Sequence, residues 1–399
     1  MKTYVEKVID NLYVIRIDDT ETRYFEALWS IPEGITYNAY LLTTNEGAVL
    51  FDTWKQVYAD LFIETLKEIV DPRDVGYIIV HHMEQDHSGA LPKILRANNY
   101  KAIVYGHPLV ANMIKPFYGI TPSFKPVRDD EVLEVSGYKL RFIHTPWLHW
   151  PETIMTFIEE LETLVSCDAF GSYSIPSGLF DDQLDDGKLE KYLKYSKKYV
   201  ATVIGHYKEY VIKNIKKLKN IGINPKIIAP SHGLIWRRNP NLIMERYIEW
   251  SKGLGKEKKA TIVYGSMYGE VSEAIKYLVN KLIEKKWVVK TYAFTDKERA
   301  SIGDILADIV DSRLLVIGVS TYEASISPLI KYVLELIVEK LRYDKQVLVI
   351  ASYGWGPVAG GRVSEMLRKA GFRLLDVIEF RGRMDEDVAT RIDNLINSL

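Results

Sequence analysis

The feature that most constrains the fold of this 399-residue chain is a run of ten residues that begins at Val80 and reads VHHMEQDHSG. The residues before it, 76–80, are short, apolar and β-branched, which predicts a buried strand. Four potential metal ligands therefore lie on a loop at the carboxyl end of a strand: His82, Glu84, Asp86 and His87.

Alternate residues of an extended segment point to the same side, so His82, Glu84 and Asp86 are expected to converge, with His87 displaced from them. A single histidine on a loop is more often a helix cap than a ligand. Two imidazoles and two carboxylates in six residues exceed what one metal ion usually draws from one loop. The cluster therefore favours a metal centre, provided that further ligands follow downstream.

Three further ligand candidates follow apolar runs or lie in a loop bounded by proline. His149 lies in TPWLHWP, Asp168 follows a strand-like run, and His232 follows KIIAPS. A carboxylate such as Asp168 can bridge two cations, because each of its two oxygens can bind one of them. His81 points the opposite way along its strand and is expected to pack. The same holds for Cys167, which is expected to be buried facing away from Asp168.

Composition narrows the class of protein. The apolar content of 47% and the charged content of 26% are typical of a globular protein. The net charge of -1 gives no electrostatic reason to expect nucleic acid or an anionic membrane as a partner. No membrane span or signal peptide is expected, and the sole cysteine, Cys167, excludes an intrachain disulfide or a built-in rubredoxin. A cytoplasmic location is the expectation.

The length predicts two domains. Residues 1–252 alternate short strands and helices with ligands at strand ends, which is typical of a layered α/β sandwich. The linker is expected at 253–259, where glycines and a charge run follow a helix. Residues 258–399 alternate five strands with five helices, which predicts a doubly wound parallel sheet of flavodoxin type.

Three loops at the carboxyl ends of these later strands carry the chemistry of a nucleotide-type ligand. The first opens a helix with small and hydroxyl residues, which suits a phosphate. The third places Trp355 where it can lie against a flat ring. The candidate residues are Ser266, Met267, Tyr268, Gly269, Glu270, Val271, Ser320, Thr321, Tyr322, Glu323, Ala324, Ser352, Tyr353, Gly354, Trp355 and Gly356.

The first domain resembles the metallo-β-lactamase fold, because an H-x-x-x-D-H loop is followed by a distant His, an Asp and a final His. Hydrolases of that fold usually have His where this chain has Glu84. The glutamate, together with the LHWP segment around His149, resembles the flavodiiron proteins. A hard carboxylate in place of a nitrogen ligand suits iron. The SMYG loop resembles the FMN domain of the same family, but it continues with Glu270 and Val271 where Asn-Thr is usual.

The resemblance implies an αββα sandwich with a di-iron centre, followed by a flavodoxin-like FMN domain. His82, Glu84 and His149 would hold one iron, and Asp86, His87 and His232 the other, with Asp168 bridging them. FMN would pass electrons to the two irons for the reduction of dioxygen to water or of nitric oxide to nitrous oxide. The implied partners are an external donor such as rubredoxin and a second copy of the chain, in a head-to-tail homodimer or a dimer of dimers.

Two other functions fit parts of the sequence. A binuclear metallohydrolase with an accessory flavodoxin domain would use the metals to activate water, but Glu84 and the flavin-type loops argue against it. An electron carrier without catalysis would require a vestigial metal cluster, although all the ligand candidates are present. Trp147, Trp150 and Tyr24 are candidate contacts in a dimer, and core packing is an equal alternative for each.

Overall fold

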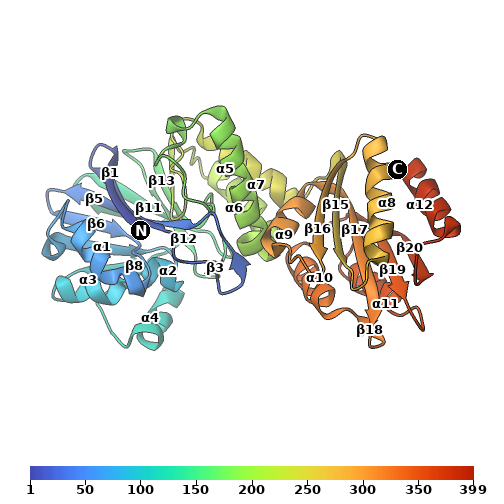
Figure 1. Cartoon of the computed structure of the whole chain (residues 1–399). Helices are drawn as coiled ribbons and strands as arrows, with labels where there is room; N and C mark the ends of the chain where they lie inside the picture. Colours follow the sequence, from blue (N-terminus) through green and yellow to red (C-terminus); the bar gives the residue numbers. More distant parts are fainter. The chain divides into compact units, whose positions relative to one another are not determined.

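The structure of the protein is a computed structural model that describes residues 1–399. The chain divides into two compact units. Unit 1 comprises Met1–Tyr199 and Tyr207–Ile248, and unit 2 comprises Val200–His206 and Glu249–Leu399. In Figure 1 the first unit runs from blue to yellow-green, and the second runs from yellow to red and also includes the green segment Val200–His206.

Unit 1 contains two sheets. The larger has the strand order β1-β2-β5-β6-β7-β8-β9, and the smaller has the order β10-β11-β12-β13-β14. The strands of the larger sheet are β1 (Lys2–Ile9), β2 (Leu12–Asp19), β5 (Ile35–Thr44), β6 (Gly47–Phe51), β7 (Val75–Val80), β8 (Ile103–Gly106) and β9 (Phe124–Pro126). Those of the smaller are β10 (Val132–Val135), β11 (Tyr138–His144), β12 (Ile154–Ile158), β13 (Thr163–Cys167) and β14 (Ile227–Pro230).

One hydrophobic core joins the two sheets. Leu42, Phe51 and Ile79 from the larger sheet share a buried cluster with Phe142 and Val165 from the smaller one. Burying each such side chain contributes roughly 1.5–3 kcal/mol. The two sheets therefore form the inner layers of a sandwich, because each has an apolar face that must be covered.

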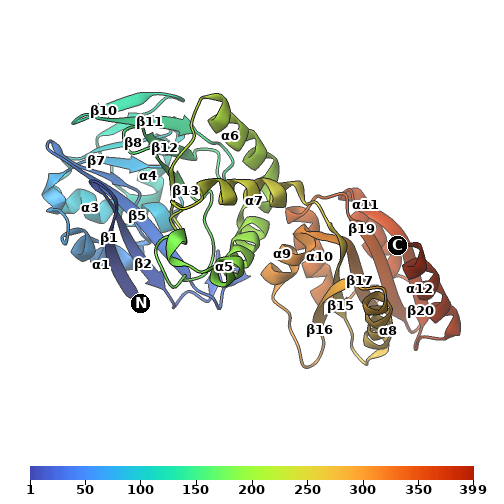
Figure 2. The same cartoon turned by 90° about the horizontal axis from the view of Figure 1, so that it is seen from above.

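Helices cover the outer faces of this sandwich. Figures 1 and 2 show α1 and α3 on one side of the sheets and α5 and α6 on the other. The helices of this part of the chain are α1 (Ala59–Leu66), α2 (Gln85–Ser88), α3 (Leu91–Ala97), α4 (Ala111–Tyr118), α5 (Asp186–Tyr199), α6 (Lys208–Asn220) and α7 (Pro240–Lys252). A short hairpin of β3 (Tyr24–Phe25) and β4 (Trp29–Ser30) completes the unit. The predicted α/β sandwich is confirmed, although β1, β3, β4, β9 and β10 were not predicted.

Unit 2 is built on a parallel sheet with the order β16-β15-β17-β19-β20, which is the doubly wound flavodoxin order. Its long strands are β15 (Lys256–Gly265), β16 (Val288–Phe294), β17 (Ser312–Tyr322), β19 (Gln346–Tyr353) and β20 (Arg373–Arg381), and the short β18 (Ser325–Ile326) pairs antiparallel to β17. Its helices are α8 (Glu270–Glu284), α9 (Ile302–Val310), α10 (Pro328–Lys340), α11 (Ala359–Lys369) and α12 (Glu386–Ser398).

Helices lie on both faces of this sheet. Figure 1 shows α8 and α12 on one face and α9 and α10 on the other. The sheet residues Ile262, Val316 and Ile350 pack against α8 and α12 in one buried cluster. The predicted alternation of strands and helices is confirmed throughout this unit.

The expected linker at 253–259 requires a correction, because β15 begins at Lys256. Lys259 is buried and forms ion pairs of 2.7 Å with Asp308 and 2.5 Å with Asp311. A lysine with two carboxylate partners can be buried, so this charge run does not mark a flexible connection. Every helix of the structure is too short or too polar to cross a lipid bilayer.

A second unpredicted feature lies between α5 and α6. The π-helical turn Val200–Ile204 and the residues up to His206 pack with unit 2, and the turn contacts α9. His206 anchors the segment, because its Nδ1 lies 3.1 Å from the backbone oxygen of Glu339 and 2.9 Å from its carboxylate.

Candidate functional site

The candidate metal centre lies at the carboxyl ends of four strands of the sandwich. β7 leads into His82 and Glu84, and the connection from β11 to β12 carries His149. The parallel strands β13 and β14 end just before Asp168 and His232. Strands from both sheets thus deliver ligand candidates to one edge of the sandwich.

The local conformation differs from the expected extended loop after Glu84. Residues Gln85–Ser88 form the helical turn α2, which carries Asp86 and His87. The alternation rule therefore ends at Glu84, and Asp86 does not lie beside His82. His87 is not displaced from the site, because the turn directs it inward with Asp86.

The first group of potential ligands comprises His82, Glu84, His149 and Asp168. Glu84 Oε2 lies 3.1 Å from Nε2 of His82 and 2.9 Å from Nε2 of His149. The second group comprises Asp86, His87 and His232. Their atoms converge in the same way, with Nε2 of His87 3.4 Å and Nε2 of His232 3.5 Å from the carboxylate of Asp86.

Asp168 lies between the two groups and presents a different oxygen to each. Its Oδ2 is 3.5 Å from Nε2 of His82 and 3.6 Å from Nε2 of His149. Its Oδ1 is 3.0 Å from Nε2 of His87 and 3.2 Å from Nε2 of His232. This is the geometry that a carboxylate bridging two cations requires.

The chemistry of this donor set fits metal ions. Both carboxylate oxygens of Asp86 and Nε2 of His232 are buried without a hydrogen-bond partner. Unpaired buried polar atoms are costly, and a carboxylate buried without a partner is more so. Since three ligand carboxylates converge here, cations would satisfy both the unpaired atoms and the excess negative charge.

The pKa shifts of the ligand candidates also favour a metal centre. Burial lowers the pKa of His87, but the charges of Asp168 and Asp86 outweigh this effect and raise its pKa to about 9. Burial alone would raise the pKa of Asp168, yet His87 and His232 hold it well below the usual range. In the same way, His149 and His82 lower the pKa of Glu84 against burial. The cavity thus favours positive charge at its centre.

Two residues that the sequence analysis did not identify contact the ligand candidates. Glu152 Oε1 lies 3.1 Å from Nδ1 of His82 and also accepts the backbone N–H of Met83. The Tyr199 hydroxyl donates a hydrogen bond of 2.8 Å to Oδ1 of Asp168. Glu152 directly follows the proline-bounded loop that carries His149, a signal that could have been used. No sequence signal indicates Tyr199.

Cys167 requires a correction. It is fully buried, as expected, but its Sγ lies 3.9 Å from Oδ2 of Asp168 and close to His87. The backbone of Cys167 has φ of 53°, so the strand alternation no longer holds at this residue. Burial, followed by the charge of Asp168, raises the pKa of the thiol well above its usual value, so the group stays a neutral thiol.

The other histidines lie outside the two groups. His81 is buried between Oδ2 of Asp52 at 2.7 Å and Oγ1 of Thr156 at 2.8 Å. His107 and His144 lie against each other with ring centroids 4.5 Å apart.

The predicted phosphate loop opens α8 in unit 2. The Ser266 hydroxyl accepts hydrogen bonds from the backbone N–H groups of Gly269 and Ser272. Gly269 has no side chain that could cap the helix, so the N–H groups of Glu270 and Val271 in its first turn can bind an anion. The side chain of Val271 is buried in the core and can offer only its backbone to a ligand.

The other two predicted loops lie next to each other on neighbouring strands. Ser320 pairs with Ser352 in the sheet. The Thr321 hydroxyl accepts the N–H of Ala359 at the start of α11. Trp355 is 99% exposed, which excludes the core as its environment. Other exposed aromatic or apolar side chains of these loops are Met267, Tyr268 and Tyr322.

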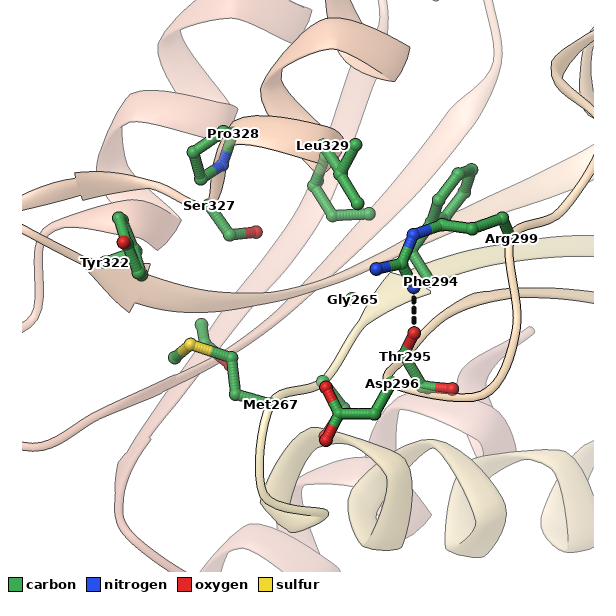
Figure 3. A pocket seen from close by; sticks show the side chains of 13 residues that line it. Gly265, Met267, Phe294, Thr295, Asp296, Arg299, Tyr322, Ser327, Pro328 and Leu329 are labelled. Atoms are coloured by element: carbon green, nitrogen blue, oxygen red, sulfur yellow. Dashed lines mark hydrogen bonds between the residues drawn. The ribbon is translucent and has the colours of Figure 1, made fainter.

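A pocket with a volume of about 270 Å³ lies beside the predicted phosphate loop. Figure 3 shows the side chains that line it. Met267 and Tyr322 from the predicted loops face it, and so does Ser327 at the start of α10. Residues not predicted from the sequence also line it: Thr295, Asp296 and Arg299, which follow β16, and Ser327 to Ile330.

Comparisons with known proteins agree with this architecture. The ODP family beta lactamase model matches residues 35–233, and the flavodoxin model matches residues 262–394. A nitric oxide reductase from Moorella thermoacetica is 30% identical over 92% of this chain and 90% of its own length. An anaerobic nitric oxide reductase flavorubredoxin from Vibrio vulnificus is 27% identical over 95% of this chain and 76% of its own length.

A solved structure gives a closer match. A mutant of a flavo di-iron protein from Thermotoga maritima superposes with a TM-score of 0.94 and 41% sequence identity, covering 99% of this chain and 98% of that one. The similarity extends over both units and keeps their order along the chain. The chain therefore belongs to the flavodiiron protein family.

Proposed function

We propose that this chain is an oxidoreductase that passes electrons from an external donor through FMN to two irons, and uses them to reduce nitric oxide to nitrous oxide or dioxygen to water. The observation that carries the proposal is the position of Asp168 between the two ligand groups, with one oxygen directed to each. The similarity to a nitric oxide reductase and to a flavo di-iron protein supports the same reaction class.

In this proposal His82, His149 and Glu84 would hold the first iron, and His87, His232 and Asp86 would hold the second. Asp168 would offer one oxygen to each. The carboxylates favour iron, because hard anionic oxygens suit a metal that changes its charge. The irons would supply electrons one at a time and an open position for a small molecule.

The reaction requires protons as well as electrons. Reduction of two nitric oxide molecules to nitrous oxide and water takes two electrons and two protons, and reduction of dioxygen to two waters takes four of each. Six of the seven ligand candidates are buried, whereas Glu84 is partly exposed. Glu84 lines a pocket of about 420 Å³ together with Tyr24 and Lys55, and this pocket would give a small substrate a path to the centre.

FMN is proposed to bind at the three loops of the flavodoxin-like sheet. The N-terminus of α8, with the hydroxyl of Ser266, would hold the phosphate. The exposed side chain of Trp355 is placed to lie against the flat ring. A rubredoxin or a similar one-electron carrier is the proposed donor, since a relative of this chain is a flavorubredoxin. The catalytic unit is proposed to be a head-to-tail homodimer.

Metal analysis together with a visible spectrum tests this proposal. We expect about two irons per chain, a flavin absorption band, and production of nitrous oxide or consumption of dioxygen by the chemically reduced protein. Comparing the two rates under the same reductant then identifies the preferred substrate. Two zinc ions per chain with no flavin would contradict the proposal and support a metallohydrolase.

A further inference from the structure

The two metal positions have matched ligands but unmatched surroundings. Each position has two imidazoles, one carboxylate of its own and one oxygen of Asp168. Any electronic difference between the positions must therefore come from the groups that contact these ligands from outside.

At the first position, the carboxylate of Glu152 contacts the outer nitrogen of His82. If Nε2 of His82 faces the metal, its Nδ1 carries the proton and donates to Oε1 of Glu152 at 3.1 Å. Glu152 is only 1% exposed, and the N–H of Met83 fixes the same oxygen in place. An anionic acceptor raises the basicity of the imidazole, so His82 donates more electron density to its metal.

On the second position, the matching contact is neutral. Nδ1 of His232 lies 2.7 Å from the backbone oxygen of Thr36. No ion pair joins the outer nitrogen of His87 or His149 to a carboxylate, so His82 alone has this kind of partner. The second position therefore lacks the additional negative charge that Glu152 gives to the first.

A hydrogen bond to Asp168 adds to the same difference. The Tyr199 hydroxyl donates to Oδ1, which is the oxygen directed to His87 and His232. A donated hydrogen bond withdraws electron density from this oxygen and weakens it as a ligand. The only corresponding contact at Oδ2 is the thiol of Cys167 at 3.9 Å, and a thiol is a weak donor.

We propose that Glu152 and Tyr199 are positioning residues that make the two metal positions electronically unequal. Glu152 lowers the reduction potential of the iron at His82, Glu84 and His149, and Tyr199 raises that of the iron at Asp86, His87 and His232. The first electron that reaches the centre is then held at the second position. This inference rests on the proposed di-iron function.

The test is a redox titration of the iron-loaded protein, enriched in ⁵⁷Fe and followed by electron paramagnetic resonance and Mössbauer spectroscopy. Glu152→Gln keeps an acceptor for His82 but removes the charge, so the lower of the two midpoint potentials should rise. Tyr199→Phe removes the hydrogen bond to Asp168, so the higher potential should fall. Each change should reduce the stability constant of the one-electron-reduced state on the order of tenfold, which corresponds to about 59 mV.

Asp52→Asn is the matched control. Asp52 is a buried carboxylate on a buried histidine, His81, but that histidine belongs to neither ligand group. Asparagine tolerates the positive φ of 56° at this residue. The control should leave both midpoint potentials unchanged, so it separates a general effect of removing a buried charge from an effect on the metal position.

The outcomes separate this inference from the proposed function. If the wild-type protein holds two irons and reduces its substrate, but neither variant shifts a single potential in the stated direction, the inference is wrong and the proposed function stands. Equal shifts of both potentials in both variants would also overturn it. If Glu152→Gln loses iron, its midpoint potentials cannot be measured. The Tyr199→Phe potentials then test the inference by themselves. A wild-type protein without two irons overturns the proposed function itself.

Discussion

Oε2 of Glu84 lies 2.9 Å from Nε2 of His149, at a position where hydrolases of the metallo-β-lactamase fold usually carry a third imidazole. Glu84 thus places a carboxylate between the imidazoles of His82 and His149. Glu84 is therefore the residue most directly tied to the choice between iron and zinc.

Replacing Glu84 with His should change that choice. We expect Glu84→His to lose iron and gain zinc when cells grow with both metals, and to lose reductase activity. Elemental analysis of the purified protein measures the two metals. The neighbouring exposed residue provides the control, because Gln85→His adds an imidazole without removing a carboxylate. An unchanged ratio of iron to zinc in Glu84→His would show that Glu84 does not select the metal.

Replacing Asp168 with Asn should abolish activity and lower the iron content of both positions together. A neutral amide cannot bridge two cations as a carboxylate does. Changes to residues that only contact the ligands lower metal affinity roughly 10–100-fold, so the loss of iron affinity in Asp168→Asn should be at least as large. The measurement is iron per chain after dialysis.

Cys167→Ala is the control for this variant, because Cys167 is buried beside Asp168 and stays a neutral thiol. It should keep its iron. Full iron and full activity in Asp168→Asn would remove Asp168 from the site.

Replacing Trp355 with Ser should change the flavin and not the stability. Because the side chain is 99% exposed, the free energy of unfolding should change by no more than about 0.5 kcal/mol. Flavin affinity and the flavin spectrum should both change if the indole lies against the ring. Tyr332→Ser, an exposed aromatic on α10, is the control and should leave the flavin unaffected. A Trp355 variant with an unchanged spectrum and affinity would place the flavin elsewhere.

Replacing Lys259 with Met should destabilise unit 2 by about 3–5 kcal/mol, because Asp308 and Asp311 then lose the buried cation that they share. Denaturant unfolding followed by the fluorescence of Trp287 measures this. Lys256→Met is the control from the same charge run. Its side chain is 69% exposed, so it should cost no more than about 1 kcal/mol.

The same ion pairs predict a dependence on pH. Burial lowers the pKa of Lys259, but Asp308 and Asp311 outweigh this and raise it above the usual value. The stabilisation is therefore fully present below pH about 10.4 and is lost as the pH rises through the higher pKa of the folded state. Lys259→Met should remove this loss of stability at alkaline pH.

Mixing two inactive chains tests the proposed dimer. One chain carries His82→Ala with Asp168→Asn, and the other carries Ser266→Asp, which places a carboxylate where the phosphate of FMN would bind. If flavin and iron pair across subunits, each hybrid dimer keeps one intact pair and activity returns after subunit exchange. Confirmed hybrid dimers without activity would exclude the cross-subunit arrangement. Among the aromatic candidates, Tyr24 is 59% exposed, whereas Trp147 stacks on Tyr207.

His82, Asp168 and His232 could be predicted as ligand candidates because each follows an apolar run that reads as a strand. His149 could be predicted from its proline-bounded loop. The conformation of Asp86 and His87 could not, because the choice between an extended loop and one helical turn depends on the surrounding packing. The same limit applies to Cys167, whose positive φ reverses the expected direction of its side chain.

The contacts that Glu152 and Tyr199 make with the ligand candidates could not be predicted from the sequence for a different reason. Glu152 reaches His82, and Tyr199 reaches Asp168, only because the fold brings together segments with no shared pattern. In unit 2 the alternating strands were regular enough to predict the parallel sheet and the loop that opens α8. The pocket residues after β16 and at the start of α10 carry no motif, so they required the structure.

The segment Val200–His206 gives the chain an unusual order of assembly. It packs with unit 2, although residues of unit 1 precede and follow it. During synthesis on the ribosome this segment emerges before any strand of the sheet it will join, so unit 1 must fold around a loop whose binding surface does not yet exist. A fragment that starts at residue 249 would lack the segment and leave the contacting part of α9 uncovered. The flavodoxin-like half is thus completed by residues that are translated before the rest of it.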